Sequence, residues 1–231
     1  MNKQQVLETL KYLRENSSKR NFSQSVDLII NLQNLDLKKP EHKIEFYMQL
    51  PKSKNKKVKI GGFVDAQLAT QAKKVLDTVI LKDELDTWKQ DIKKQKKLAN
   101  SHDFFIAQVD IMAKTAATFG KVLGSRGKMP NPKAGCVVPG TANLEPIVKK
   151  LQDTIKIQTK NELSIKASIA LESMNDEDIA ENAIVVYNNL VPKLPQEKNN
   201  IKDIFLKFTM SPAVKVGEKP KQETKVKENK K

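Results

Sequence analysis

Four short stretches of the chain alternate hydrophobic and polar residues with a period of two. Such alternation is typical of strands that bury one face of an antiparallel sheet and leave the other face open. Two of the stretches, 26–32 and 44–50, lie near the start of the chain, and the other two, 165–171 and 204–210, lie near its end. The pattern therefore predicts a four-stranded antiparallel sheet to which both ends of the chain contribute.

The middle of the chain follows a different pattern, in which nearly continuous hydrophobic runs alternate with helical segments. The runs are VKIGGFV, TVILK and DFFIAQV, and the predicted helices cover residues 66–76, 84–100 and 111–119. Continuous hydrophobic runs are expected of parallel strands that are covered on both faces. Because strands and helices that alternate in this way build right-handed βαβ units, we expect a Rossmann-like parallel domain here.

Together these patterns predict a discontinuous domain with a second domain inserted into it, a two-domain fold of mixed α/β and α+β class. The predicted first domain comprises residues 1–64 and 156–213, and the inserted domain comprises residues 65–155. Two amphipathic helices, near the start of the chain and at 175–191, are expected to cover one face of the open sheet. Residues 214–231 lack a hydrophobic period and are expected to form a flexible basic tail.

The composition adds a strong electrostatic signal, because 42 lysines and arginines outnumber 27 acidic residues and give a formal net charge of +15. A field of this kind attracts polyanions, of which RNA is the commonest. The single cysteine, Cys136, excludes an internal disulfide and indicates a reducing compartment. No hydrophobic run approaches the roughly 20 residues of a membrane span, so no membrane partner is expected.

The motifs of common nucleotide-binding enzymes do not occur in the sequence. A Walker phosphate loop around Gly127 and Lys128 fails, because Val122 stands at its first glycine and Met129 at its hydroxyl position. The segment GGFVDAQLA lacks the third glycine of a dinucleotide-binding fingerprint. The two histidines lie far apart, without the spacing of a metal site. The sequence therefore predicts no catalytic residue, no cofactor and no metal.

The segment LGSRGKMPNPKAG, residues 123–135, is a first candidate for a phosphate-binding surface. From residue 111 to residue 144 the chain has no acidic residue, while Arg126 and Lys128 are among its basic ones. An acid-free basic segment does not repel a polyanion, and glycines let the backbone approach it closely. An ordered loop whose glycines satisfy turn geometry accounts for the same residues equally well. The sequence leaves both interpretations open.

A second candidate is KFTMSP, residues 207–212, at the end of the last alternating strand. Its hydroxyl and thioether groups are suited to contacts with the sugar and base edges of RNA. A methionine at a strand end is more often part of a hydrophobic core. Phe22 in KRNFSQS can likewise be interpreted as a core residue or as an RNA contact, although the neighbouring Lys19 and Arg20 favour a phosphate nearby.

Several segments, taken in order, resemble the L1 family of large-subunit ribosomal proteins, in its archaeal-type branch. They are RNFSQSVDLIINL, KKPE, HDFFIAQVDIM, LGSRGKMPNPKAG and IKDIFLKFTMSPAVKV. The resemblance implies a discontinuous RNA-binding domain, an inserted Rossmann-like domain and a hinge between them. It also implies a non-catalytic, cytoplasmic, ribosome-bound protein, monomeric within the ribosome, that binds the ribosomal RNA of the mobile stalk near exit-site tRNA. Many members of the family also bind their own messenger RNA and repress its translation.

The resemblance assigns the main RNA contacts to the discontinuous domain. The expected RNA-binding residues are Phe22, Ser25, Thr209, Met210, Ser211, Lys207, Lys19 and Arg20, with Arg126 and Lys128 as auxiliary contacts. Three positions depart from the family pattern. Ser211 replaces the usual glycine, Ser125 replaces the usual proline, and Asn21 stands where many relatives carry lysine or arginine.

Two other functions are compatible with parts of this pattern. The first is a nucleotide-binding enzyme built on the Rossmann-like domain, which the missing phosphate motifs disfavour. The second is a regulator that acts only on messenger RNA outside the ribosome. The sequence does not separate this second function from a ribosomal one, because one RNA-binding surface can serve both.

Overall fold

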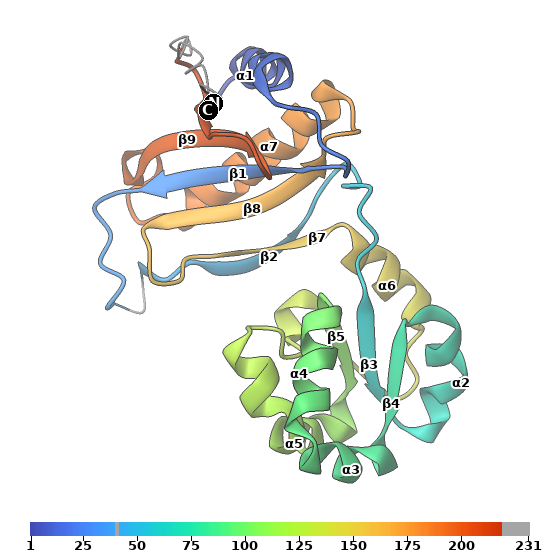
Figure 1. Cartoon of the computed structure of the whole chain (residues 1–231). Coiled ribbons are helices and arrows are strands. Elements are labelled where there is room, and N and C mark those ends of the chain that lie inside the picture. The colour runs from blue at the N-terminus through green and yellow to red at the C-terminus, as the bar shows by residue number, and fades with distance from the viewer. Residues whose placement is uncertain (40–41, 219–231) are drawn as a thin grey trace, which may run out of the picture. The chain divides into compact units, whose positions relative to one another are not determined.

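A computed structural model of the chain describes residues 1–39 and 42–218 (Figure 1). The chain divides into two compact units. The first unit comprises Met1–Glu45 and Ile157–Lys231, and the second comprises Phe46–Lys156. A two-stranded ribbon, β2 (Glu45–Gln49) paired with β7 (Thr154–Gln158), carries the two chain crossings between them.

The first unit is built on a four-stranded sheet in the order β10-β9-β1-β8. Its strands are β1 (Ser25–Leu32), β8 (Ser164–Leu171), β9 (Ile201–Phe208) and β10 (Val214–Lys215), and every neighbouring pair is antiparallel. In the central strand Leu28 lies opposite Ala167 on one side and Leu206 on the other. This confirms an antiparallel sheet assembled from both ends of the chain.

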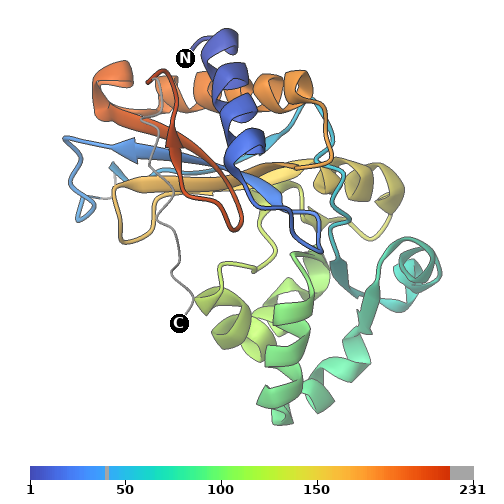
Figure 2. The same cartoon turned by 45° about the horizontal axis from the view of Figure 1, so that its top comes forward.

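Two helices, α1 (Lys3–Asn16) and α7 (Asp176–Leu190), cover the same face of this sheet (Figures 1 and 2). Their inward side chains pack with the alternate, buried positions of the strands. The buried set includes Val6, Leu10 and Leu13 of α1, Ile179, Ala183 and Val186 of α7, and Val26, Leu28 and Ile30 of β1. The opposite face of the sheet carries half-exposed side chains such as Asp27, Ile29 and Lys207, as the alternation predicts.

The second unit contains a parallel sheet in the order β4-β3-β5-β6. Its strands are β3 (Ile60–Val64), β4 (Thr78–Leu81), β5 (Phe104–Gln108) and β6 (Val137–Val138). Its helices are α2 (Ala66–Val75), α3 (Leu85–Gln90), α4 (Ile92–Ser101), α5 (Met112–Ser125) and α6 (Leu144–Gln152). Short 3₁₀ turns occur in both units at Lys82–Glu84, Val109–Ile111, Pro132–Ala134, Val191–Lys193 and Glu197–Asn200. No helix among the described residues is long and apolar enough to span a bilayer.

The two glycines of β3 permit the close packing of the parallel sheet. A Cβ atom on Gly62 would lie 2.4 Å from Cδ1 of Leu76, and one on Gly61 would lie 2.8 Å from the ring of Phe105. Both neighbours are themselves buried. The GG pair therefore serves core packing, not phosphate binding.

The structure corrects four details of the predicted organisation. The stretch at 44–50 pairs with β7 outside the four-stranded sheet, and the short β10 takes the fourth position. Alternation marks a strand but does not select its partner. The predicted flexible tail at 214–231 is also corrected, because Val214–Lys215 pairs with β9 and belongs to the sheet. Residues 219–231 lie outside the described part of the chain. The remaining two corrections concern the inserted unit.

The first crossing of the chain lies between Glu45 and Phe46, not near residue 65, because β3 pairs in parallel with β4 and β5. The helix predicted at 84–100 is two helices, α3 and α4. Asp91 interrupts it, with φ −113° and ψ 84°, and its carboxylate caps α4 by accepting a hydrogen bond from the backbone N–H of Lys94.

Candidate nucleic-acid interface

The start of β1 and the end of β9 meet at one end of the four-stranded sheet. The antiparallel register places Val26 opposite Phe208, so the next residues outward, Ser25 and Thr209, lie side by side. The backbone N–H of Thr209 donates to the carbonyl of Ser25 at 3.1 Å. Sheet register thus joins the KRNFSQS segment to the KFTMSP segment, which are far apart in the sequence.

The side chains of Ser25 and Thr209 form a fixed hydroxyl pair. The Ser25 N–H donates to Thr209 Oγ1 at 3.0 Å, and the two hydroxyl oxygens are also 3.0 Å apart. Ser25 Oγ donates to Asp27 Oδ1 at 3.2 Å. Because an ionised carboxylate only accepts, this bond takes the Ser25 proton, and we assign Thr209 as the donor to Ser25 Oγ. The remaining lone pair of Thr209 Oγ1 is then an acceptor for an outside group.

Gln24 holds the other side of this junction in place. It is only 1% exposed, and its Oε1 accepts the backbone N–H of Met210 at 3.1 Å. Its own backbone is tied to Glu172, whose N–H donates to the Gln24 carbonyl at 2.8 Å. The hydrogen bonds of Gln24 therefore hold the backbone of Met210 in place.

Ser211 closes the turn after β9. Its hydroxyl oxygen accepts the backbone N–H of Phe208 at 2.8 Å, and its own N–H donates to the Phe208 carbonyl at 3.1 Å. The Ser211 hydroxyl also lies 3.0 Å from the carbonyl of Pro212. The hydroxyl is thus engaged within the turn, although the residue is partly accessible.

Two large apolar side chains project from this fixed backbone. Phe22 is 52% exposed and Met210 is 58% exposed, so neither belongs to the hydrophobic core. Lys19 and Arg20 are exposed on the segment that carries Phe22. Lys207 lies on the open face of the sheet, opposite Asp27 in the register. Exposed apolar groups beside hydrogen-bonding groups and cations suit RNA, whose bases stack and whose sugars and phosphates accept hydrogen bonds.

Sequence reasoning missed Gln24, Asp27 and Glu172, which position this site. Gln24 directly precedes the first alternating strand, and Asp27 is a polar position within it. The alternation places Asp27 on the open face, but nothing in the pattern shows which hydroxyl it accepts. The Ser25–Asp27 contact is local, between two residues of the same strand, whereas the contacts of Ser25 with Thr209 and of Gln24 with Met210 depend on the cross-strand register.

The sequence model of the Ribosomal protein L1p/L10e family matches residues 13–212, which span both units and every residue of this junction. The chain belongs to the ribosomal protein L1 family. It is 42% identical over 214 residues to the large ribosomal subunit protein uL1 of Methanothermobacter thermautotrophicus, covering 92% of this chain and 99% of that protein. It is 41% identical over 215 residues to uL1 of Pyrococcus abyssi, covering 93% and 96% of the two chains.

These matches confirm the resemblance to the archaeal-type L1 branch. Ribosomal proteins are structural constituents and not enzymes, in agreement with the expectation that this chain has no catalytic role. The matches concern the chain as a whole and not single RNA contacts. The assignment of Phe22, Thr209 and their neighbours to RNA binding therefore stays a prediction.

In this L1-family chain, the two basic residues expected as auxiliary contacts have internal partners. The ammonium group of Lys128 donates to the carbonyls of Ala99 at 2.9 Å and His102 at 2.7 Å, at the C-terminal end of α4. Arg126 Nε donates to Asn100 Oδ1 at 3.0 Å. A lysine at a helix C-terminus satisfies carbonyls that lack helical partners. These contacts support the interpretation of residues 123–135 as a loop that maintains the fold of the inserted unit.

A buried glutamine lies at the place where a Rossmann-like sheet would hold a nucleotide in this L1-family member. The switch point lies between the carboxyl ends of β3 and β5. The buried side chain of Gln108 accepts the N–H of Asp65 at 3.0 Å there and donates to Asp110 at 3.1 Å. A Cβ on Gly140 would lie 2.9 Å from Gln108 Nε2. The carboxylates of Asp65 and Asp110 at this point oppose phosphate binding, which disfavours the nucleotide-binding enzyme.

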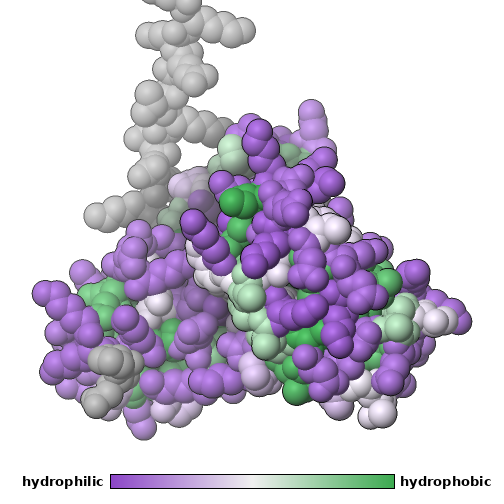
Figure 3. Space-filling model, turned by 90° about the horizontal axis from the view of Figure 1, so that it is seen from below, coloured by the Kyte–Doolittle hydropathy of each residue, from purple (hydrophilic) through white to green (hydrophobic). Residues whose placement is uncertain are grey.

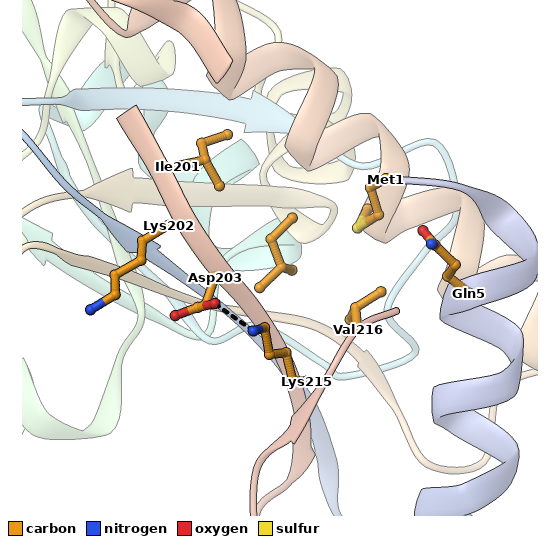
Figure 4. A pocket seen from close by; sticks show the side chains of 8 residues that line it. Met1, Gln5, Ile201, Lys202, Asp203, Lys215 and Val216 are labelled. Carbon is orange, nitrogen blue, oxygen red and sulfur yellow. Dashed lines mark ion pairs between the residues drawn. The ribbon is translucent and has the colours of Figure 1, made fainter. Parts of the chain in front are cut away.

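The other reactive groups of the chain also have structural surroundings. Burial raises the pKa of the Cys136 thiol to about 11, so the thiol is protonated at neutral pH. Within the described part of the chain, no three His, Cys, Asp or Glu side chains are grouped to hold a metal ion. A pocket of about 220 Å³ between the start of α1 and β9 contains an ion pair between Lys215 and Asp203 at 2.9 Å (Figure 4). Hydrogen bonds to Glu218 and then to Asp203 raise the pKa of Lys215, so this cation is already paired.

Proposed function

We propose that this chain, a structural protein of the large ribosomal subunit by its family, binds ribosomal RNA through the junction of β1 and β9. The observation that carries the proposal is the fixed Ser25–Thr209 hydroxyl pair with exposed Phe22 and Met210 beside it. Most of the surface visible in Figure 3 is hydrophilic, and the chain carries a formal charge of +15. A polar, cationic surface with a few exposed apolar groups is chemically suited to folded RNA.

Two kinds of interaction would act together in this binding. The distributed positive charge attracts RNA of any sequence and makes the affinity depend on salt. The junction adds selectivity, because the acceptor on Thr209 Oγ1 is suited to a ribose 2′-hydroxyl and Phe22 offers a face on which a base stacks. Pinning by Gln24 and Asp27 lowers the entropy cost of binding, since the side chains and backbone are already ordered.

The finer assignment follows from the resemblance of the junction motifs to the L1 family. We propose that the RNA is the mobile stalk near the tRNA exit site, with exit-site tRNA as a neighbour, and that the protein acts in the cytoplasm as part of the ribosome. The same surface would bind a stalk-like segment of its own messenger RNA and repress translation. A regulator that acts only on messenger RNA would bind that leader segment but would not be recovered with large ribosomal subunits.

The first test is the binding of the purified chain to a stalk-region RNA fragment and to a scrambled fragment of equal length. Titrations from roughly 50 to 300 mM salt separate charge from recognition. We expect the stalk fragment to bind more than about a thousandfold more tightly, within the specificity ratios of nucleic-acid-binding proteins. Thr209→Val and Met210→Ala should each weaken binding to the stalk fragment by about tenfold or more, as mismatched contacts do, and leave the scrambled fragment unaffected.

Matched controls are available in the second unit. Thr87→Val removes an exposed hydroxyl, and Ile92→Ala truncates an apolar side chain that is 52% exposed, close to the exposure of Met210. These variants should bind both RNAs like the parent. If the two fragments bind alike, or if the controls weaken binding as much as the junction variants do, the proposed site is wrong.

A further inference from the structure

The second unit carries an exposed cluster of lysines that neither the junction nor the family motifs account for. The connection between β2 and β3, which we call the lysine loop, has the sequence PKSKNKKVK at residues 51–59. Lys52, Lys56, Lys57 and Lys59 are exposed, while Lys54 is partly buried. Five cations therefore lie within one short connection that contains no acidic residue.

The ends of the lysine loop are held by hydrogen bonds. At its start, the N–H of Leu50 donates to the carbonyl of Asp153 at 2.9 Å. At its end, Gln152 bridges Val58 by accepting its N–H at 2.9 Å and donating to its carbonyl at 3.1 Å. The Lys59 N–H donates to the Asp103 carboxylate at 3.3 Å. The loop thus presents its charges from a backbone that is closed at both ends.

The amino-terminal edge of the parallel sheet in this unit is rich in lysines, and the carboxyl edge carries several acids together with Lys82. The lysine loop enters β3, and the lysine pairs in the last turns of α2 and α6 lie at the same amino-terminal edge, because these helices run back toward the strand starts. Acidic residues follow the strands at the carboxyl edge. They are Asp65 after β3, Asp83 and Glu84 after β4, and Asp110 after β5.

Asp77, Asp103 and Asp153 also lie at the amino-terminal edge, and the first two are engaged with the backbone. Asp77 accepts the N–H of Ile60 at 2.9 Å, and Asp103 accepts the N–H of Lys59. The ammonium group of Lys57 lies 3.9 Å from the Asp77 carboxylate, and the Lys57 side chain is 82% exposed. An exposed pair of this length is weak and leaves the lysine available to a stronger anion. Because the lysines at the amino-terminal edge outnumber these acids, this edge carries a net positive charge.

We propose that the lysine loop is a second RNA-binding surface, which contacts the phosphate backbone without reading sequence. The proposal rests on the proposed RNA-binding function and adds a contact on the inserted unit, at the sheet edge opposite the one where Rossmann-like folds bind nucleotides. Lysines in the last turns of α2 and α6 also complement the helix dipoles, which accounts for them without RNA. The loop lysines lie outside any helix, so that explanation does not extend to them.

The test compares two triple variants of the full chain that remove the same charge. Lys56→Gln, Lys57→Gln and Lys59→Gln change the lysine loop. Lys93→Gln, Lys96→Gln and Lys97→Gln change an equally exposed set on α4 in the same unit. The measurement is the slope of log affinity against log salt for the stalk-region fragment and for its scrambled counterpart. The slope should fall by about one unit for each phosphate that is no longer neutralised, so the loop variant should show a decrease of about two to three units on both RNAs.

Three outcomes decide the proposal. A smaller slope in the loop variant alone supports it, and a Lys→Arg version of the same triple should then retain the parent slope. Equal changes in the two Gln triples, or no change in either, would overturn it. Thermal unfolding without RNA checks that each variant is folded. Failure of the parent to prefer the stalk fragment would contradict the proposed function, while the difference between the triples would still decide this surface.

Discussion

At the scale of single residues, Ser211 occupies a position where the resemblance to the L1 family leads us to expect a glycine. Glycine is favoured where φ is positive, and Ser211 is not among the described non-glycine residues with positive φ. Its hydroxyl closes the turn by accepting the Phe208 N–H. The serine therefore fits the backbone without strain and adds a hydrogen bond that glycine lacks.

We expect Ser211→Ala to lower the free energy of unfolding by about 0.5–1.5 kcal/mol, the usual net contribution of one hydrogen bond. Ser211→Gly should cost about 0.4–1 kcal/mol more, because glycine gives the unfolded chain more freedom. Denaturant titration of both variants measures these losses. A Ser211→Gly variant as stable as the parent would show that the turn bond contributes nothing.

The hydrophobic pattern predicts the candidate site around Thr209 and Met210 only in part. The alternation places Thr209 and Met210 at a strand end, and the structure agrees with that placement. The exposure of Met210 does not follow from the pattern, because a methionine at this position suits a core equally well. The 58% exposure depends on Gln24, which holds the Met210 backbone from the start of another strand.

At the scale of elements, basic side chains at the end of α5 and in the loop after it form hydrogen bonds within the protein, while most of those of the lysine loop are exposed to solvent. Lys128 and Arg126 attach the end of α5 and the following loop to the last turn of α4. The lysine loop instead has its backbone held by Gln152 and Asp103, and most of its ammonium groups are exposed. Both loops are basic in sequence, and only the packing of α4 against α5 shows that the basic side chains of the loop after α5 have partners within the protein.

Lys128→Met should therefore reduce stability more than RNA binding. Loss of charged hydrogen bonds to the Ala99 and His102 carbonyls is expected to lower the free energy of unfolding by about 1.5–3 kcal/mol. Lys133→Met is the matched control, because Lys133 is exposed on the same loop. It should leave stability within about 0.5 kcal/mol of the parent, as surface substitutions usually do. If Lys128→Met instead leaves stability intact and weakens RNA binding more than Lys133→Met, Lys128 is an RNA contact.

At the scale of the whole molecule, the positive charge is spread over both units and continues beyond the described residues. Residues 219–231 contain six lysines and two glutamates, a net charge of +4 by sequence. Neither half of the junction belongs to this segment, because Ser25 lies near the other end of the sequence and Thr209 precedes residue 219. Charge and recognition should therefore separate when the segment is removed.

Ending the chain after Glu218 should weaken binding to stalk-region and scrambled RNA by the same factor. The salt slope should fall on both RNAs, by about one unit for each phosphate that the removed segment neutralised. The preference for the stalk fragment should stay unchanged, because that preference comes from the junction. The measurement is the ratio of the two affinities at fixed salt, before and after truncation. A changed ratio would show that the segment reads RNA structure.

Local periodicity, composition and motifs were enough to establish the two kinds of sheet, the interruption of one unit by another, the cationic character and the family. All of these are properties of neighbouring residues, so they can be read along the chain. Other features came from the folded molecule: β10 replaces the stretch at 44–50 in the sheet, Gln24 holds the Met210 backbone at the junction, and Lys128 is an internal cap. Each of these depends on contacts between distant parts of the chain, and strand register and helix packing set those contacts without leaving a periodic signal in the sequence.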